Sequence, residues 1–149
     1  MTLQRIDLFR GEYRWLSNFW IAEVEFEGQQ YPSTEHAFQA AKTRDRAKRA
    51  LIATLPRCGD AKRAGRALDL RVDWEGIKDD VMYRVCLDKF TRHPDLRAKL
   101  LATGDAQLVE GNDHGDRYWG VCHGVGKNML GITLMRIRAE LLPSALYGG

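Results

Sequence analysis

The spacing of apolar residues separates a β-rich beginning of the chain from a helical remainder. Residues 5–9 and 23–26 are short runs in which polar and apolar side chains alternate, as in half-buried strands. The pair Glu27-Gly28 separates the second run from residues 29–31, which is typical of a β-hairpin. We therefore expect short strands near the N-terminus, with a turn at Glu27-Gly28.

From Ser33 onward the pattern becomes helical. Pro32 stands directly before the first helix, and alanine-rich apolar positions follow at helical spacing. Proline, glycine and capping residues mark the ends of further helices. Their predicted ranges are residues 47–54, 60–66, 74–91, 94–102 and 128–142. In this scheme Gly65 ends the second of these five helices, and Asp73 caps the third.

The segment between the last two helices is predicted to form a short strand over residues 108–110 and a loop over residues 111–127. The sequence shows no regular alternation of strands and helices, which argues against a Rossmann fold. No internal repeat or linker is visible. We therefore predict one helix-rich α+β domain over residues 1–149, with a small β-hairpin or sheet near the N-terminus.

The composition fits an ordinary folded protein rather than a membrane or fibrous one. The chain has 149 residues, of which 44% are hydrophobic and 29% charged, enough for one domain with a single core. No apolar run approaches the ~18 residues of a membrane-spanning helix. The first ten residues, MTLQRIDLFR, lack the apolar core of a secretory signal. We expect a cytoplasmic protein without membrane contact, and the sequence leaves its oligomeric state open.

Cysteine and histidine do not form a recognisable site. The three cysteines, Cys58, Cys86 and Cys122, form no CxxC pair, and an odd number is a poor disulfide framework. His123 follows Cys122, but adjacent side chains usually point apart, which disfavours a Cys–His dyad. The four histidines show no paired spacing of metal ligands. No metal or redox cofactor is expected.

The net charge of +3 is small, but Lys and Arg are concentrated in residues 42–71. Two interpretations remain open. The favoured one is a solvated helix surface, and the other is an electropositive flank for a phosphorylated ligand or nucleic acid. The small total argues against a protein dedicated to packaging nucleic acid.

Three segments carry candidate chemistry, and the first is the run from Trp15 to Trp20. Its two tryptophans, Phe19 and the amide of Asn18 offer stacking surfaces and a hydrogen-bonding group. That combination suits a planar base, whose faces stack and whose edges are recognised by amides. Alternatively, the tryptophans anchor the loop on the core.

The second segment is the first helix, in which Glu35, Phe38 and Lys42 fall on one stripe. At a rise of 1.5 Å per residue, the Cα atoms of Glu35 and Lys42 lie about 10 Å apart, which is too far for a simple ion pair. The spacing suits two groups that hold opposite sides of one sugar. From spacing alone, the favoured interpretation is simpler: the carboxylate stabilises the start of the helix, and the lysine is solvated.

The third segment, residues 113–131, combines glycines with Tyr118 and Trp119 before the last helix. Loops of this length are usually functional or disordered, and the aromatic residues argue for order. Glycines before a helix allow backbone amides to approach a phosphate. The run GVGKN lacks the spacing of a P-loop, however, so the glycine pattern alone is weak evidence.

Together, eight stretches of the chain resemble the NADAR family (NAD- and ADP-ribose-associated proteins, also called YbiA-like). They run in the family's order over nearly the whole chain: LSNFW (16–20), YPSTEHAFQAAK (31–42), AKRAGR (61–66), RVDWEGIKDDVM (71–82), KF (89–90), LLATGDAQLVE (100–110), DRYWG (116–120) and GKNMLGITLMRIR (126–138). One departure is WGVCHGVG, where relatives often have WG-(D/C)-G-x-x-G. This departure bears on the substrate preference of the loop and not on the resemblance to the family.

The resemblance implies a small helix-rich α+β fold and chemistry at N-glycosidic bonds. Two activities are attributed to the family. One hydrolyses the N-glycosidic bond of early phosphorylated intermediates of riboflavin biosynthesis, and the other removes ADP-ribose from modified guanine in DNA or RNA. We therefore expect an N-glycosidase that acts on a phosphorylated ribosylamine or an ADP-ribosyl substrate. The alternatives are a non-catalytic module that binds ADP-ribose or a nucleotide, and a general nucleic-acid-binding protein.

The resemblance also implies the site residues. Glu35, Lys42 and Asp116 are the expected catalytic residues. The expected substrate-binding residues are Asn18, Phe19, Trp20, Trp119, Gly120, Gly126 and Asn128. The aromatic residues would stack on the base or flank the sugar. Backbone amides near residues 124–128, with Arg or Lys from residues 44–66, would bind phosphate.

Two mechanisms are compatible with these residues. Both family substrates join ribose C1 to an exocyclic aryl amine, so the sugar can open to an imine. Lys42 would then displace the amine and form a Schiff base, with Lys62 and Lys89 as alternative lysines and Glu35 moving protons. In the rival mechanism, Glu35 and Asp116 stabilise an oxocarbenium-like state, and one of them activates water.

Overall fold

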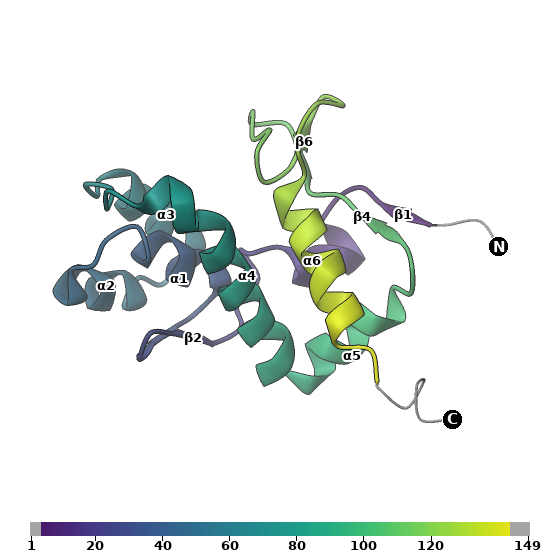
Figure 1. The fold of residues 1–149 in the computed structure, drawn as a ribbon, viewed down its shortest axis with the longest axis horizontal. Helices are drawn as coiled ribbons and strands as arrows, with labels where there is room; N and C mark the ends of the chain where they lie inside the picture. The colour runs from purple at the N-terminus through teal and green to yellow at the C-terminus, as the bar shows by residue number, and fades with distance from the viewer. Residues whose placement is uncertain (1–3, 144–149) are drawn as a thin grey trace.

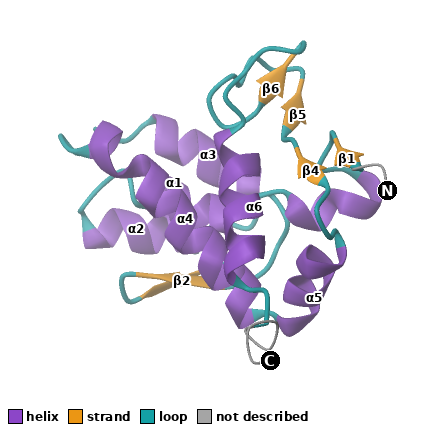
Figure 2. Cartoon of the chain, turned by 45° about the vertical axis from the view of Figure 1, so that its right-hand side comes forward, coloured by secondary structure: helices purple, strands orange, loops and turns teal. Residues whose placement is uncertain are grey.

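The computed structural model describes residues 4–143 and shows a helix-rich α+β fold (Figures 1 and 2). The helices in that range are α1 (Thr34–Ala40), α2 (Arg46–Ala53), α3 (Cys58–Arg66), α4 (Trp74–Arg92), α5 (Pro94–Ala102) and α6 (Met129–Glu140). Each matches a predicted helix to within a few residues. A 3₁₀ helix, η1 (Gly11–Leu16), was not predicted from the sequence.

The strands form three separate two-stranded sheets. The predicted hairpin is present: β2 (Val24–Phe26) pairs antiparallel with β3 (Gln29–Tyr31). The other strands are β1 (Arg5–Ile6), β4 (Gln107–Leu108), β5 (Gly111–Asn112) and β6 (Val121–Cys122). β1 pairs in parallel with β4, and β5 with β6.

These pairings correct two expectations. The strand expected over residues 5–9 covers only Arg5–Ile6, and it joins β4 rather than the hairpin. The loop expected over residues 111–127 contains β5 and β6. Strands of two residues have too few positions to show alternation, and they exist only because a distant segment supplies their hydrogen bonds.

The helices are arranged around α4, which runs through the middle of the molecule (Figure 1). α1 packs against α2, α3 and α4, while α4 also contacts α5, α6 and β2. Every residue of α1 is buried. A surface helix would have a polar face, so the burial of Glu35, His36 and Gln39 on this short helix requires partners for their polar atoms.

The start of α1 is fixed by Ser33 and His36. Ser33 Oγ accepts a hydrogen bond from the backbone N–H of His36 at 3.1 Å, as an N-cap does. The imidazole of His36 lies 2.7 Å from Ser33 Oγ through Nδ1 and 2.9 Å from the carbonyl oxygen of Leu55 through Nε2. Burial lowers the pKa of His36, so a neutral ring is favoured. These contacts orient the first turn, which carries Glu35.

Two local expectations are corrected by the structure, whereas Gly65 lies at the C-terminal end of α3, one residue before its last, as expected. α1 ends at Ala40, so Lys42 lies in the following turn, where its backbone N–H donates to the carbonyl oxygen of Gln39. Asp73 occupies the N-cap position of α4, but its side chain makes no capping bond and pairs with Arg71 and Arg44 instead. Two guanidinium partners hold the carboxylate more strongly than a backbone amide would.

Gly65 is needed where α3 approaches α1. A Cβ atom at this position would overlap the side-chain amide of Gln39 on α1. The close approach of the two helices therefore depends on the missing side chain.

Among residues 4–143, no helix is both long and apolar enough to cross a bilayer.

Candidate active site

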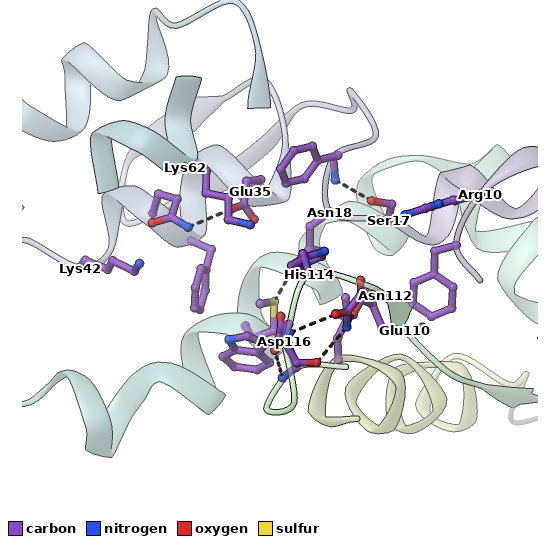
Figure 3. Close-up of a pocket in the computed structure, with 18 residues that line it drawn as sticks. Arg10, Ser17, Asn18, Glu35, Lys42, Lys62, Glu110, Asn112, His114 and Asp116 are labelled. Atoms are coloured by element: carbon purple, nitrogen blue, oxygen red, sulfur yellow. Dashed lines mark hydrogen bonds between the residues drawn. The ribbon is translucent and has the colours of Figure 1, made fainter. Parts of the chain in front are cut away.

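A cavity of about 450 Å³ lies between the helices α1 and α3 on one side and residues 110–119 on the other (Figure 3). We call these sides the helical wall (Glu35, Phe38, Gln39, Lys42 and Lys62) and the loop wall (Glu110, Gly111, Asn112, His114, Asp116 and Trp119). The remaining lining residues are Phe9, Arg10, Ser17, Asn18, Phe19, Met82 and Leu130. The volume suits a small phosphorylated metabolite.

Glu35 is the most enclosed acid of the helical wall. Its side chain is 7% exposed, and its Oε1 accepts a hydrogen bond from Gln39 Nε2 at 2.8 Å. Burial raises the pKa of Glu35, and Asp116 adds to the rise, while the Gln39 bond, Lys62 and Lys42 oppose it. A raised pKa lets the carboxyl group keep its proton to a higher pH than an ordinary glutamic acid does, as a general acid requires.

Lys42 is half-buried and lines the same wall as Glu35, with Nζ 5.9 Å from the centre of the Phe38 ring. Burial lowers the pKa of Lys42, and Arg66 and Lys62 add to this effect, whereas Glu35 opposes it. A lowered pKa increases the fraction of neutral amine, which is the nucleophilic form.

On the loop wall, Asp116 is fixed by hydrogen bonds to its own loop. Its Oδ1 accepts bonds from the backbone N–H groups of Tyr118 at 3.1 Å and Trp119 at 2.9 Å. The side chain of Asn112 accepts from the backbone N–H of Asp116 at 3.0 Å and donates to its carbonyl oxygen at 2.9 Å. Asp116 therefore faces the cavity in one defined orientation.

Aromatic contacts join the two walls. The ring of Trp119 packs edge-on against Phe38 of α1, with centroids 5.3 Å apart, and Phe38 in turn lies 5.1 Å from Trp74. Tyr118 packs edge-on against Trp119 at 4.9 Å. Because Trp119 adjoins both Asp116 and Phe38, it sets the distance between the helical wall and the loop wall.

Comparisons with known proteins bear on the family and the fold. A family model described as the NADAR domain matches residues 8–142. The chain belongs to the NADAR family. N-glycosidase YbiA of Escherichia coli (strain K12) is 41% identical over 133 residues, which cover 87% of this chain and 82% of the relative. The NMR structure of E. coli YbiA superposes with a TM-score of 0.87 at 38% identity, covering 98% of this chain and 89% of that one.

Two further relatives extend the comparison. N-glycosidase Npun_R5314 of Nostoc punctiforme is 36% identical over 135 residues, covering 87% of this chain and 86% of the relative. Riboflavin biosynthesis protein VVA0006 of Vibrio vulnificus is 36% identical over 135 residues, covering 89% of this chain and 36% of that longer protein. The family expected from the eight stretches and the α+β fold are thus confirmed.

The structure brings six of the expected NADAR site residues to the cavity. They are Asn18, Phe19, Glu35, Lys42, Asp116 and Trp119. Phe19 is 47% exposed, so its ring is accessible for stacking. The amide of Asn18 is largely occupied: Oδ1 accepts from Thr34 Oγ1 at 2.9 Å, and Nδ2 lies 3.3 Å from Met82 Sδ. Its carbonyl oxygen accepts from the N–H of Glu35, so Asn18 also positions α1.

The other four expected residues do not line the cavity. Trp20 packs against the core and lies under the guanidinium of Arg14. Gly120 and Gly126 allow close packing of the loop, since a Cβ on Gly120 would overlap Glu110 and one on Gly126 would overlap the carbonyl of Gly120. Asn128 donates to the carbonyl oxygen of Leu108 at 2.9 Å. The two glycines and Asn128 therefore shape the loop wall from behind.

The expected phosphate site at the backbone amides of residues 124–128 is not supported. The amides of Val125, Lys127 and Asn128 donate to carbonyl oxygens of Cys122, Arg117 and Gly120 within the same loop. The positive charge that reaches the cavity comes instead from Arg10, Lys42 and Lys62.

The alternative lysines are separated by the structure. Lys62 of α3 lines the cavity, whereas Lys89 of α4 is fully buried outside its lining. Lys89 Nζ donates to the carbonyl oxygens of Trp15 at 2.7 Å and Ser17 at 3.0 Å, and burial lowers its pKa to about 8. Lys89 therefore holds the loop that carries Asn18.

Several lining residues were not identified from the sequence: Arg10, Gln39, Glu110, Asn112 and His114. Glu110 ends the family-like stretch LLATGDAQLVE, and this position directly after a short apolar strand was the available signal. Gln39 lies one turn after Glu35, on a helix for which no buried polar face was expected.

Among residues 4–143, no group of three or more His, Cys, Asp or Glu is arranged to hold a metal ion.

Proposed function

We propose that this protein is an N-glycosidase that hydrolyses the bond between ribose C1 and an exocyclic aryl amine. The N-glycosidase class follows from family membership and from relatives that carry this name, which also confirm the expected enzyme class. The observation that carries the proposal for this chain is the enclosed Glu35, which lines one cavity together with Lys42 and Asp116.

The substrate that best fits the cavity is a phosphorylated ribosylamine. Carboxylates on both walls provide acceptors for ribose hydroxyl groups, and Phe19 and Trp119 provide aromatic surfaces for the aryl amine. Arg10, Lys42 and Lys62 supply the positive charge that a phosphate requires. An early intermediate of riboflavin biosynthesis has all three parts, and relatives from Vibrio vulnificus and Zea mays are named riboflavin biosynthesis proteins.

The proposed reaction begins with opening of the ribosylamine to an imine at C1. The neutral amine of Lys42 adds to C1, and the aryl amine leaves with the electron pair of the C1–N bond after gaining a proton. Water then hydrolyses the lysine Schiff base and releases the sugar phosphate. Glu35, which is enclosed in the same cavity as Lys42, is the group that moves protons between these species.

Borohydride trapping separates this mechanism from the oxocarbenium route. A reduced adduct should form on the wild type during turnover and be lost in Lys42→Ala. Full activity of Lys42→Ala without any adduct would favour the route through Glu35 and Asp116. An adduct that persists in Lys42→Ala and disappears in Lys62→Ala would reassign the lysine.

The proposed partners are two candidate substrates, of which the first is the phosphorylated ribosylamine. The second substrate to be tested is ADP-ribosylated guanine in DNA or RNA, for which the basic segment 42–71 would offer a flank. Several of its arginines are already paired with Asp60 and Asp73, which weakens this second candidate.

The proposed location is the cytoplasm, since Cys58, Cys86 and Cys122 are free and buried.

The deciding experiment incubates the wild type with both substrates and measures the released aryl amine, ribose phosphate or ADP-ribose by mass spectrometry. We expect release from the phosphorylated ribosylamine. A binding module would give no product, and its affinity for ADP-ribose would persist or increase in Glu35→Ala because a carboxylate near phosphates opposes binding.

A further inference from the structure

A second enclosed carboxyl group, Glu110, faces the same cavity from the loop wall (Figure 3). It lies between β4 and β5, outside any helix or strand. The route through Lys42, Glu35 and Asp116 does not use it. A half-buried acid with no assigned role is unusual in a small cavity, because burial disfavours its charged form.

The backbone of Glu110 is fixed from two directions. Its N–H donates to Asn128 Oδ1 at 2.9 Å, and its carbonyl oxygen accepts from the N–H of Val121 at 2.9 Å. Asn128 has the left-handed φ of 56° and donates to the carbonyl oxygen of Leu108 through Nδ2. The side-chain amide of Asn128 thus bridges the backbone of Leu108 and that of Glu110 and holds Glu110 at the cavity.

The carboxyl group of Glu110 is fixed as well. Its Oε2 accepts a hydrogen bond from Asn112 Nδ2 at 3.2 Å, and Gly120 leaves the space that this oxygen fills. Among residues 4–143, Glu110 forms no ion pair, and its Oε1 has no hydrogen-bond donor, which leaves that oxygen open to the cavity. The loop is therefore built to present this group to a ligand.

The charged neighbours of Glu110 differ from those of Glu35. Burial, with Asp116, raises the pKa of Glu110 to about 7, while Asn112, Lys62 and Arg10 oppose the rise. Glu35, Lys42 and His114 line the same cavity. Glu35 accepts a bond from Gln39 and has the ammonium groups of Lys62 and Lys42 among its charged neighbours, and these favour a carboxylate that takes up protons.

We propose that Glu110 is a further catalytic residue, the proton donor to the exocyclic nitrogen of the leaving amine, with Glu35 on the facing wall accepting protons. As the C1–N bond breaks, its electron pair stays on nitrogen, and nitrogen receives the proton of Glu110, so a neutral aryl amine departs. Water adds to C1 and gives one proton to Glu35, which returns through solvent to Glu110. One water is consumed, and one amine and one sugar phosphate are formed. This inference rests on the proposed function.

The test uses leaving groups of different basicity. The substrates are the N-(5-phosphoribosyl) derivatives of 4-methoxyaniline and 4-nitroaniline, with rates corrected for uncatalysed hydrolysis. A weakly basic amine needs little help from an acid, so Glu110→Gln should lose about 100- to 1,000-fold in kcat on the methoxy substrate and about tenfold or less on the nitro substrate. Glu35→Gln should lose activity on both substrates alike.

The pH profile provides a second measurement. In the wild type, kcat/KM should fall as the pH rises above about 7, because Glu110 must carry a proton. Glu110→Gln should abolish this decline, and Glu110→Asp, which keeps a carboxyl group, should retain it at a lower rate. The exposed Glu12→Gln, outside the cavity lining, is the matched control and should behave as the wild type.

The outcomes are distinguishable. Equal losses of Glu110→Gln on the two substrates, together with an unchanged decline above pH 7, would overturn the role of Glu110 while leaving the N-glycosidase intact. Inactivity of the wild type on both substrates would overturn the proposed function and this inference with it. Thermal melting of each variant checks that it is folded. If Glu110→Gln does not fold, the measurements on Glu110→Asp decide the role of Glu110.

Discussion

On the helical wall of the cavity, Glu35 is held by a regular helix that Ser33 caps and by one side-chain bond from Gln39. On the loop wall, Asp116 and Glu110 are held by individual side-chain-to-backbone bonds, chiefly from Asn112 and Asn128. A helix distributes its stability over many equivalent hydrogen bonds, whereas each bond of the loop wall is unique. The helical wall should therefore tolerate changes around Glu35 better than the loop wall tolerates loss of one asparagine.

The largest expected effect comes from the acid of the helical wall itself. Glu35→Gln keeps the shape of the side chain but removes its proton chemistry, so kcat should fall by about 1,000-fold or more. The raised pKa means that the folded state binds the proton more tightly than the unfolded chain, so the stability contribution of Glu35 falls as the pH rises above the ordinary value of 4.5. At pH 8 the variant should thus melt at the same or a higher temperature than the wild type.

The next effect tests the nucleophile beside it. Lys42→Ala should lose about 100-fold or more in kcat, together with the borohydride adduct, because no amine remains to attack C1. Lys42→Arg is the matched variant: it keeps the positive charge but cannot form a Schiff base. Activity of Lys42→Arg close to that of the wild type would show that position 42 contributes charge alone.

On the loop wall, Asn112 bonds both to the carboxyl group of Glu110 and to the backbone of Asp116. Asn112→Ala removes its bonds to the Asp116 backbone and to the Glu110 carboxyl group, and kcat should fall by about 10- to 100-fold through misplacement. The loss of these half-buried bonds should also cost about 1–3 kcal/mol of unfolding free energy. Denaturant unfolding measures the stability, and steady-state kinetics measure kcat. A drop in stability without a drop in kcat would mean that the loop wall does not position catalytic groups.

The smallest effect probes the support behind Glu35. Gly65→Ala pushes a Cβ into the amide of Gln39 and should weaken its bond to Glu35, lowering kcat by about tenfold at most and shifting the acidic limb of the pH profile upward. Gly76→Ala in α4 is the control, since nothing lies within 4 Å of its added Cβ. That change should leave kcat unchanged and add up to about 1 kcal/mol of stability.

The same contrast explains what the sequence could predict. The six helices follow from spacing and capping residues, because a helix depends on neighbours within four positions. The β1–β4 and β5–β6 pairs depend on partners far along the chain, and no local pattern marks them. Glu35 and Lys42 lie at helical spacing, but spacing alone favoured a solvated surface, and the family resemblance was needed to place them in a site.

The loop wall was predictable only in part for the same reason. Asp116 and Trp119 came from the resemblance, while Glu110 and Asn112 gained their roles from contacts with Asn128, Gly120 and Asp116. Of the glycines that suggested a phosphate site, Gly126 packs the loop closely against Gly120. Gly65 lies at the end of a helix as expected, but the need for a glycine there comes from helix α1, which lies opposite.

The central claim, that the two walls act together on one ribosylamine, is tested most directly by product analysis. The wild type and Glu35→Gln are incubated with a phosphorylated ribosylamine, and the aryl amine and sugar phosphate are quantified over time. The account predicts equal amounts of the two products with the wild type and none above the uncatalysed rate with Glu35→Gln. Product formation at the same rate by both proteins would contradict it.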